Sequence, residues 1–141
     1  MTALTVVVAD PHRELTELAV EVLIERGLNA STALTVTELT AALRPPSSVD
    51  VAVCHATLPI DAGDEQRHAL RAVLAERLDI GLVVISSRPF EDIEGIPAFA
   101  VCLQKPFGAV ELLEAVQEAH ASRPLNEHAA AWVSPIPGIP L

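Results

Sequence analysis

The stretch GLVVI at residues 81–85 is the clearest β-strand in the sequence, and it decides the choice of fold. It is a continuous apolar run rich in β-branched residues, and the stretch SSRP at 86–89 ends it. Such a run is typical of a strand that is buried on both faces of a parallel sheet. Three similar apolar runs occur at residues 4–9, 51–54 and 99–103, and they are predicted to be strands of the same sheet.

Amphipathic segments separate these runs. Apolar residues recur at helical spacing in residues 15–23, 66–78 and 108–121, which predicts three helices with apolar faces. Gly27 is expected to end the first helix, and Pro59 marks a loop before the second. Strands that alternate with helices predict βαβ units, and therefore a parallel sheet with helices on both faces.

Residues 29–48 give weaker signals. A short candidate strand at 29–33 precedes Thr35 and Glu38, which fit a capping box at the start of a helix. That helix is expected to run through Leu43, and the proline-containing stretch at 44–48 reads as a linker.

Length and charge limit the classes of function. The chain has 141 residues, which is the size of one ordinary domain, and 50% of them are hydrophobic. The net charge of −10 argues against binding to nucleic acid, which needs a basic surface, and against docking on an anionic membrane. No apolar stretch approaches the roughly 18–20 residues that a membrane span needs.

Cys54 and Cys102 each lie inside an apolar run, so we expect two buried thiols and no disulfide framework. This cysteine usage is typical of a reducing compartment. Together with the lack of a recognisable targeting segment, it predicts a cytoplasmic protein.

Polar residues follow four of the predicted strands at the point where each ends. They are Asp10 after the first strand, His55 after the third, Ser86 after the fourth and Lys105 after the fifth. Because the carboxyl ends of parallel strands meet at one edge of the sheet, these side chains are expected to gather there. That edge is where open α/β sheets usually place their ligands.

This ordered set of residues resembles the receiver domains of bacterial response regulators. The family has an acidic pair after the first strand, a phosphoacceptor aspartate after the third, Thr or Ser after the fourth, and Lys-Pro after the fifth. Asp10 and His55 are 45 positions apart, which fits the family without a gap, and the run KPF at 105–107 matches its Lys-Pro-Phe. The resemblance covers about residues 4–121.

The resemblance implies a flavodoxin-like (CheY-like) α/β fold. This is a doubly wound, five-stranded parallel sheet in the order 2-1-3-4-5. The segment at 90–97 is short and contains Gly95 and Pro97, so the fourth helix is expected to be reduced or irregular.

Three positions depart from the family pattern. The acceptor position is His55, the second acidic position is Pro11, and Cys102 stands where the family usually has Tyr or Phe as its switch residue. Phosphoryl transfer to a carboxylate needs Mg²⁺ held by several acids, and only Asp10 remains. The resemblance therefore implies a pseudo-receiver with a degenerate phosphoacceptor pocket, no catalytic activity, no cofactor and no metal. Its partner would be a kinase, a transcription factor or another regulator.

Several alternatives remain open for the residues at this edge. His55 would fill the vacant pocket and hydrogen-bond Asp10 or Ser86, or it would itself accept a phosphoryl group and make this an active phosphotransfer protein. His55, His12 and Asp10 would also suit a transition metal if they converged. Lys105 is expected to pair with Asp10, and its bond to the following proline to be cis, as the resemblance suggests. A small-molecule or nucleotide binder is a further possibility, which the lack of a glycine-rich phosphate loop weakens.

The end of the chain has a different composition. Residues 1–122 are predicted to form the receiver-like domain, and 123–141 to form a proline-rich apolar tail that cannot continue a helix. Trp132, Val133 and Ile136 are its candidate interaction residues. The tail is either an unstructured end or an extended segment that docks on this domain, on a second copy in a homodimer, or on a partner.

Overall fold

The computed structural model describes residues 3–93, 96 and 99–123. They contain a five-stranded, all-parallel sheet in the order β2-β1-β3-β4-β5, which confirms the predicted flavodoxin-like topology. The strands are β1 (Thr5–Ala9), β2 (Asn29–Ala33), β3 (Val51–His55), β4 (Gly81–Ser86) and β5 (Val101–Gln104).

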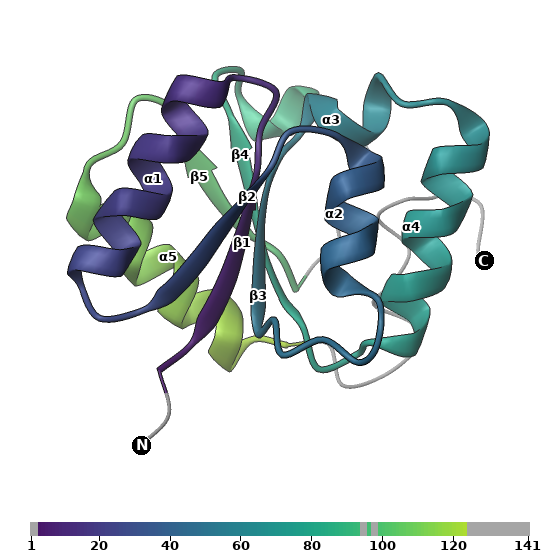
Figure 1. Cartoon of the computed structure of the whole chain (residues 1–141). Coiled ribbons are helices and arrows are strands. Elements are labelled where there is room, and N and C mark those ends of the chain that lie inside the picture. The colour runs from purple at the N-terminus through teal and green to yellow at the C-terminus, as the bar shows by residue number, and fades with distance from the viewer. Residues whose placement is uncertain (1–2, 94–95, 97–98, 124–141) are drawn as a thin grey trace.

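Helices cover both faces of the sheet (Figure 1). They are α1 (Arg13–Glu25), α2 (Val36–Leu43), α3 (Thr57–Ile60), α4 (Asp64–Glu76) and α5 (Ala109–Ala121). Helices α1 and α5 lie on one face, and α2 and α4 lie on the other. Pro59, which was predicted to lie in a loop, is part of the single turn α3.

The strands divide their side chains between two apolar cores. In β1, Val6 and Val8 pack in the core under α1 and α5, whereas Val7 and Ala9 pack in the core under α2 and α4. This division follows from the twofold alternation of side chains along a strand. Because both faces are covered, the middle residues of β1, β3 and β4 are all apolar, as the sequence predicts.

Helix α1 ends as predicted but packs differently. Gly27 adopts a left-handed φ of 88°, and its N–H donates to the carbonyl of Ile24. Of the apolar residues expected to form one buried face, Leu23 is fully buried, but Leu15 and Leu18 keep 47% and 57% of their surface exposed. The apolar periodicity of α1 therefore extends beyond the part of the helix that contacts the sheet.

Two other predicted helix boundaries can be compared with the structure. Thr35 caps α2, because its hydroxyl accepts a hydrogen bond from the Glu38 N–H at 3.1 Å. The Glu38 carboxylate reaches back to the N–H of Leu34 rather than to that of the capping residue. The helix expected to run to residue 78 ends at Glu76, because the next residue, Arg77, leaves the helical conformation.

The Arg77 side chain is buried and joins three segments of backbone. Its Nη1 donates to the carbonyl of Leu43 at 3.0 Å, and its Nη2 donates to the carbonyl of Val49 at 2.8 Å. Its Nε donates to the Asp79 carboxylate at 3.0 Å. A guanidinium group has the five donors that such a site requires, so this arginine holds the end of α2 against the start of β3.

In the described residues of the crossover between β4 and β5 (87–93, 96, 99 and 100), the one helical element is the 3₁₀ turn Phe90–Asp92, which agrees with the predicted reduction of the fourth helix. Phe90, Ile93 and Phe99 pack against the core on the α2 and α4 side of the sheet. These apolar side chains, which lie outside any α-helix, therefore cover part of the core on that face of the sheet.

The reduced crossover explains a wrong prediction for Cys102. This thiol was expected to be buried, like that of Cys54, but it is exposed, and both cysteines are free. On the edge strand β5, Leu103 points into the core under α5, whereas Cys102 and Gln104 are exposed. Among the described residues no helix lies over Cys102, and the apolar character of the run did not reveal which face of β5 was covered.

The proposed tail, including Trp132, Val133 and Ile136, lies outside the described residues. The boundary at residue 122 therefore stays a prediction. Within the described part of the chain, every helix is too short or too polar to cross a bilayer.

Candidate functional site

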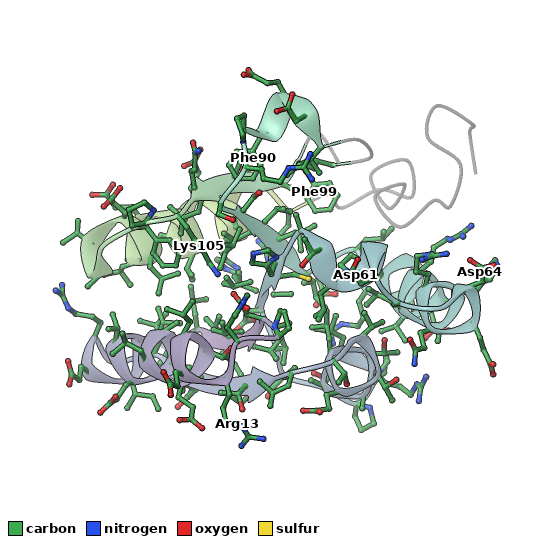
Figure 2. All side chains as sticks on the ribbon, turned by 90° about the horizontal axis from the view of Figure 1, so that it is seen from above. Arg13, Asp61, Asp64, Phe90, Phe99 and Lys105 are labelled. Carbon is green, nitrogen blue, oxygen red and sulfur yellow. The ribbon has the colours of Figure 1, made fainter. Side chains whose placement is uncertain are left out.

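Four side chains named from the sequence meet at the carboxyl edge of the sheet. Asp10 directly follows β1, His55 ends β3, Ser86 ends β4, and Lys105 directly follows β5. Figure 2 looks onto this edge from above, with Lys105 near the middle of the view and Arg13 pointing outward. The parallel topology is what brings these residues together, because their positions in the sequence span almost the whole domain.

Asp10 is the centre of the cluster, and it is almost completely buried. Its Oδ1 accepts a hydrogen bond from the His12 N–H at 2.9 Å and lies 2.8 Å from the His12 Nδ1. Its Oδ2 accepts a hydrogen bond from the Lys105 Nζ at 3.0 Å. The Thr16 hydroxyl donates to the carbonyls of Asp10 and His12, which fixes the turn between β1 and α1. Both carboxylate oxygens of Asp10 thus already accept hydrogen bonds from other residues of the protein.

Lys105 is the cationic partner of this carboxylate, as predicted. Its side chain is 18% exposed, and that of Asp10 is 3% exposed, so the ion pair is largely removed from water. The backbone N–H of Lys105 extends the hydrogen bonding between β4 and β5 by donating to the Ser86 carbonyl at 2.8 Å. The Lys105–Pro106 peptide is cis, as the resemblance implied.

His55 does not make the hydrogen bonds that were predicted for it. It is buried in the pocket, but its Nδ1 accepts a hydrogen bond from the Thr57 N–H at 3.2 Å and lies 2.9 Å from the Thr57 hydroxyl. Neither Asp10 nor Ser86 bonds to it. The reason is local, because the chain turns into α3 directly after β3 and presents the donors of Thr57 to the ring.

Ser86 and Pro11 contribute little to the cluster. The Ser86 hydroxyl is buried and accepts a hydrogen bond from the Arg88 N–H at 2.9 Å, so it serves the turn after β4. Pro11 is exposed and has no side-chain donor or acceptor. Cys102, at the predicted switch position, is exposed on the edge strand.

His12 and Thr57 bind the two central pocket residues, and neither was predicted in that role. His12 was considered only as a metal ligand, and Thr57 was not singled out. Both follow a site residue by two positions, Asp10 in one case and His55 in the other. A side chain that bonds the backbone N–H two residues on is a common turn arrangement for aspartate. That spacing was the one feature of the sequence from which His12 and Thr57 could have been predicted as partners of Asp10 and His55.

Electrostatics keep the Asp10 carboxylate ionised. Burial by itself would raise its pKa, but hydrogen bonds from the His12 N–H, the Lys105 ammonium and the His12 ring outweigh that effect. The pKa of Asp10 is therefore below its ordinary value. A charged carboxylate paired with a lysine is the resting state of this pocket at neutral pH.

His55 is held in its neutral form. Burial is the largest cause, and it lowers the pKa of the imidazole, while the Asp10 carboxylate acts in the opposite direction and Lys105 lowers the pKa further. Because Nδ1 accepts the Thr57 N–H, the ring proton resides on Nε2. A phosphoryl group would need the lone pair on Nδ1, and that lone pair already accepts the hydrogen bond from the Thr57 N–H.

The lowered pKa of His55 predicts a loss of stability in acid. An unfolded chain binds a proton at histidine near pH 6.5, whereas the folded protein resists that proton, so acid favours unfolding. The free energy of unfolding should fall below that pH with a slope of at most about 1.4 kcal/mol per pH unit from this residue. Urea unfolding at several pH values should show a shallower slope in His55→Gln. His68→Gln, on the exposed face of α4, controls for the removal of a histidine, and an equal slope in wild type and His55→Gln would contradict the expectation.

The residues at this edge do not fit the Mg²⁺ ion that receiver chemistry requires. Magnesium prefers several oxygen ligands, usually from carboxylates, and Asp10 is the one acid among the predicted pocket residues. Both of its oxygens bind donors of the protein, including a lysine ammonium. Among the described residues, no group of three or more His, Cys, Asp or Glu side chains is arranged to hold a metal ion. The rings of His12 and His55 lie 6.1 Å apart between centroids.

Comparison by sequence finds no matching protein-family model. It also finds no matching curated protein. Comparison by structure finds receiver domains. A response regulator from Thermotoga maritima matches with a TM-score of 0.65 and 26% identity, over 85% of this chain and 99% of that one. A response regulator receiver domain protein from Clostridium thermocellum matches with a TM-score of 0.67 and 20% identity, over 84% of this chain and 94% of that one.

A third similar structure contains a protein partner. It is the co-crystal structure of the Saccharomyces cerevisiae histidine phosphotransfer signalling protein Ypd1 with the receiver domain of its downstream response regulator Ssk1. It matches with a TM-score of 0.68 and 11% identity, over 91% of this chain and 96% of that one. These likenesses show that the chain has the receiver-type fold. That fold favours a signalling role of the two-component kind.

Proposed function

We propose that this chain is an atypical receiver-like signalling module that regulates a partner protein by direct binding, independently of aspartyl phosphate. The single observation that carries the proposal is the occupied pocket. Lys105 and His12 bind the one carboxylate, and Thr57 binds the one candidate nucleophile. We propose no catalysed reaction for it.

The chemistry of the pocket supports this proposal over phosphotransfer by His55. An imidazole attacks phosphorus through an unprotonated nitrogen, and in His55 that nitrogen is Nδ1, which faces the backbone of Thr57. To present a free lone pair, the ring would have to break that hydrogen bond and move its proton. The ammonium of Lys105 is held by Asp10 at 3.0 Å, so it would have to leave that carboxylate to offset the charge that develops on the phosphoryl oxygens.

The partner class follows from the surface charge and from the similar structures. A net charge of −10 disfavours nucleic acid and anionic membranes, whereas a receiver fold bound to a signalling protein is known from the Ssk1 complex. We therefore propose a kinase, a transcription factor or another regulator as the partner. A cytoplasmic location, consistent with two free cysteines, would suit this role.

The proposal predicts that acetyl phosphate does not modify the protein. The full chain is incubated with acetyl phosphate and Mg²⁺, and its intact mass is measured at neutral pH, because phosphohistidine is lost in acid. We expect no phosphoryl adduct, with His55→Ala as the matched comparison. An adduct on the wild type that disappears in His55→Ala would instead identify an active phosphotransfer protein with an unusual acceptor.

A further inference from the structure

An apolar groove lies between α1 and the start of α5. These two helices lie on the same face of the sheet (Figure 1). Its volume is about 560 Å³, within the range of about 300–1,000 Å³ that is usual for binding sites. Leu15, Leu18 and Val22 line it from α1, and Phe107 and Leu112 line it from the opposite wall. The high exposure of Leu15 and Leu18 is thus concentrated at a groove rather than scattered over the surface.

The groove carries no free charge. Its only charged lining residues are Asp10 and Lys105, and these two bind each other at 3.0 Å. An anionic or cationic ligand would have to compete with that ion pair. The lining therefore suits an uncharged, apolar occupant, which would gain free energy by covering the exposed leucines.

We propose that residues 124–141 of this chain occupy the groove, with Trp132 as the anchor. The stretch WVSPIPGIPL at 132–141 contains no charged side chain, and Trp132 is the only tryptophan in the protein. In the whole chain 20% of the residues are charged, so this stretch differs from the rest by its lack of charge. The groove and the segment are therefore chemically matched.

The connection and its length allow this docking. The last described residue, Arg123, follows α5, and α5 itself forms one wall of the groove. From the end of α5 back to Leu112 is about 14 Å at 1.5 Å per residue. The nine residues from Arg123 to Trp132 span about 28 Å in a polyproline-type conformation, so the anchor reaches the groove with chain to spare.

Two features lower the cost of docking for this segment. Its prolines at 135, 137 and 140 disfavour a helix and restrict the unbound chain to extended conformations, so less freedom is lost on binding. Covalent attachment also gives the segment an effective concentration in the millimolar range, which no separate partner at ordinary concentration matches. The second feature favours the attached segment over the same segment of a second copy of the chain.

The single tryptophan provides a direct test in the full-length protein. We expect Trp132 fluorescence to be blue-shifted and poorly quenched by acrylamide, independently of protein concentration. Leu18→Asp should lower the equilibrium constant for docking by at least roughly tenfold, because a carboxylate would have to lose its water against apolar side chains. Acrylamide would then quench the Trp132 emission much more strongly.

Helix α1 offers a matched control. Ile24→Asp introduces the same charge on the same helix, at a residue that is 54% exposed, close to the 57% of Leu18, but it does not line the groove. It should leave the Trp132 emission unchanged. Hydrogen exchange of the α1 amides gives a second readout that does not depend on Leu18→Asp folding well. Trp132→Ala should increase their exchange rates.

Three results would overturn the proposal. The first is a wild-type Trp132 that is quenched as strongly as in a short peptide, which would show that the segment does not dock. The second is protection that persists in Leu18→Asp, which would place the segment elsewhere. The third is protection that disappears on dilution, which would assign the groove to a second copy of the chain.

Discussion

The double variant Pro11→Asp, His55→Asp should accept a phosphoryl group from acetyl phosphate in the presence of Mg²⁺, whereas the wild type should not. The two substitutions restore the acids that the receiver resemblance assigns to these positions. Together with Asp10 they would place three carboxylates at the edge that already holds Ser86 and Lys105. Carboxylates hold the Mg²⁺, and the lysine adds a second positive charge beside the phosphoryl oxygens.

Binding of Mg²⁺ to this double variant gives an independent readout. Three carboxylates with one lysine repel each other without a cation, so Mg²⁺ should raise the free energy of unfolding of the double variant and leave that of the wild type unchanged. The gain would be about 2.7 kcal/mol at a concentration 100 times the dissociation constant. Pro11→Asp alone is the matched control, since it adds an acid but no acceptor. A folded double variant that binds Mg²⁺ but stays unlabelled would show that the geometry of the edge, and not these two side chains, prevents the chemistry.

The substitution Gly81→Ala should destabilise the fold by about 3 kcal/mol, the upper part of the usual range for overpacking. A Cβ at Gly81 would lie 2.4 Å from the carbonyl oxygen of Ala119, 2.6 Å from its carbonyl carbon and 2.9 Å from the nitrogen of His120. All three atoms belong to the backbone at the end of α5, so no side chain can rotate away. Either β4 or α5 would have to move, and both belong to the core.

Urea unfolding of Gly81→Ala measures this effect. Gly63→Ala is the matched control, because a Cβ there meets nothing within 4 Å. As Gly63 precedes α4 at the capping position, that change should cost less than about 1 kcal/mol. Equal stabilities for the two alanine variants would contradict the close approach of β4 and α5.

The candidate site was predictable where it depended on strand ends. Asp10, His55, Ser86 and Lys105 each end or follow an apolar run, and parallel strands carry such residues to a common edge. The pairing of Asp10 with Lys105 followed from that rule and from their opposite charges, and the structure confirms it. The reduced crossover was also predictable, because glycine and proline leave no uninterrupted helical stretch there.

The hydrogen-bond partners and the burial of several side chains were not predictable, because they depend on short turns and on which face of the sheet is covered. His55 bonds to Thr57 because the chain turns directly into α3, and this depends on backbone angles that a residue pattern does not specify. Cys102 is exposed because no helix in the described part of the chain covers its side of β5, although the run at 99–103 has the composition of a buried strand. Arg77 lies in the stretch 66–78 that was predicted to be helical, yet it follows the end of α4 and is buried, where it donates to two carbonyls on other segments.

Residue pattern alone predicted the alternation of strands and helices. Through the resemblance to receivers it also predicted the order of the sheet, with Pro11 and His55 at two positions where that family has acids. These follow from residue type and from positions along the chain, which local physics and spacing are enough to interpret. Three other features became visible when the helices were seen packed on the sheet: the donors that bind Asp10 and His55, the close approach at Gly81, and the groove beside Leu15 and Leu18. Each of these depends on distances between segments far apart in the sequence, and such distances are set when the helices pack on the sheet.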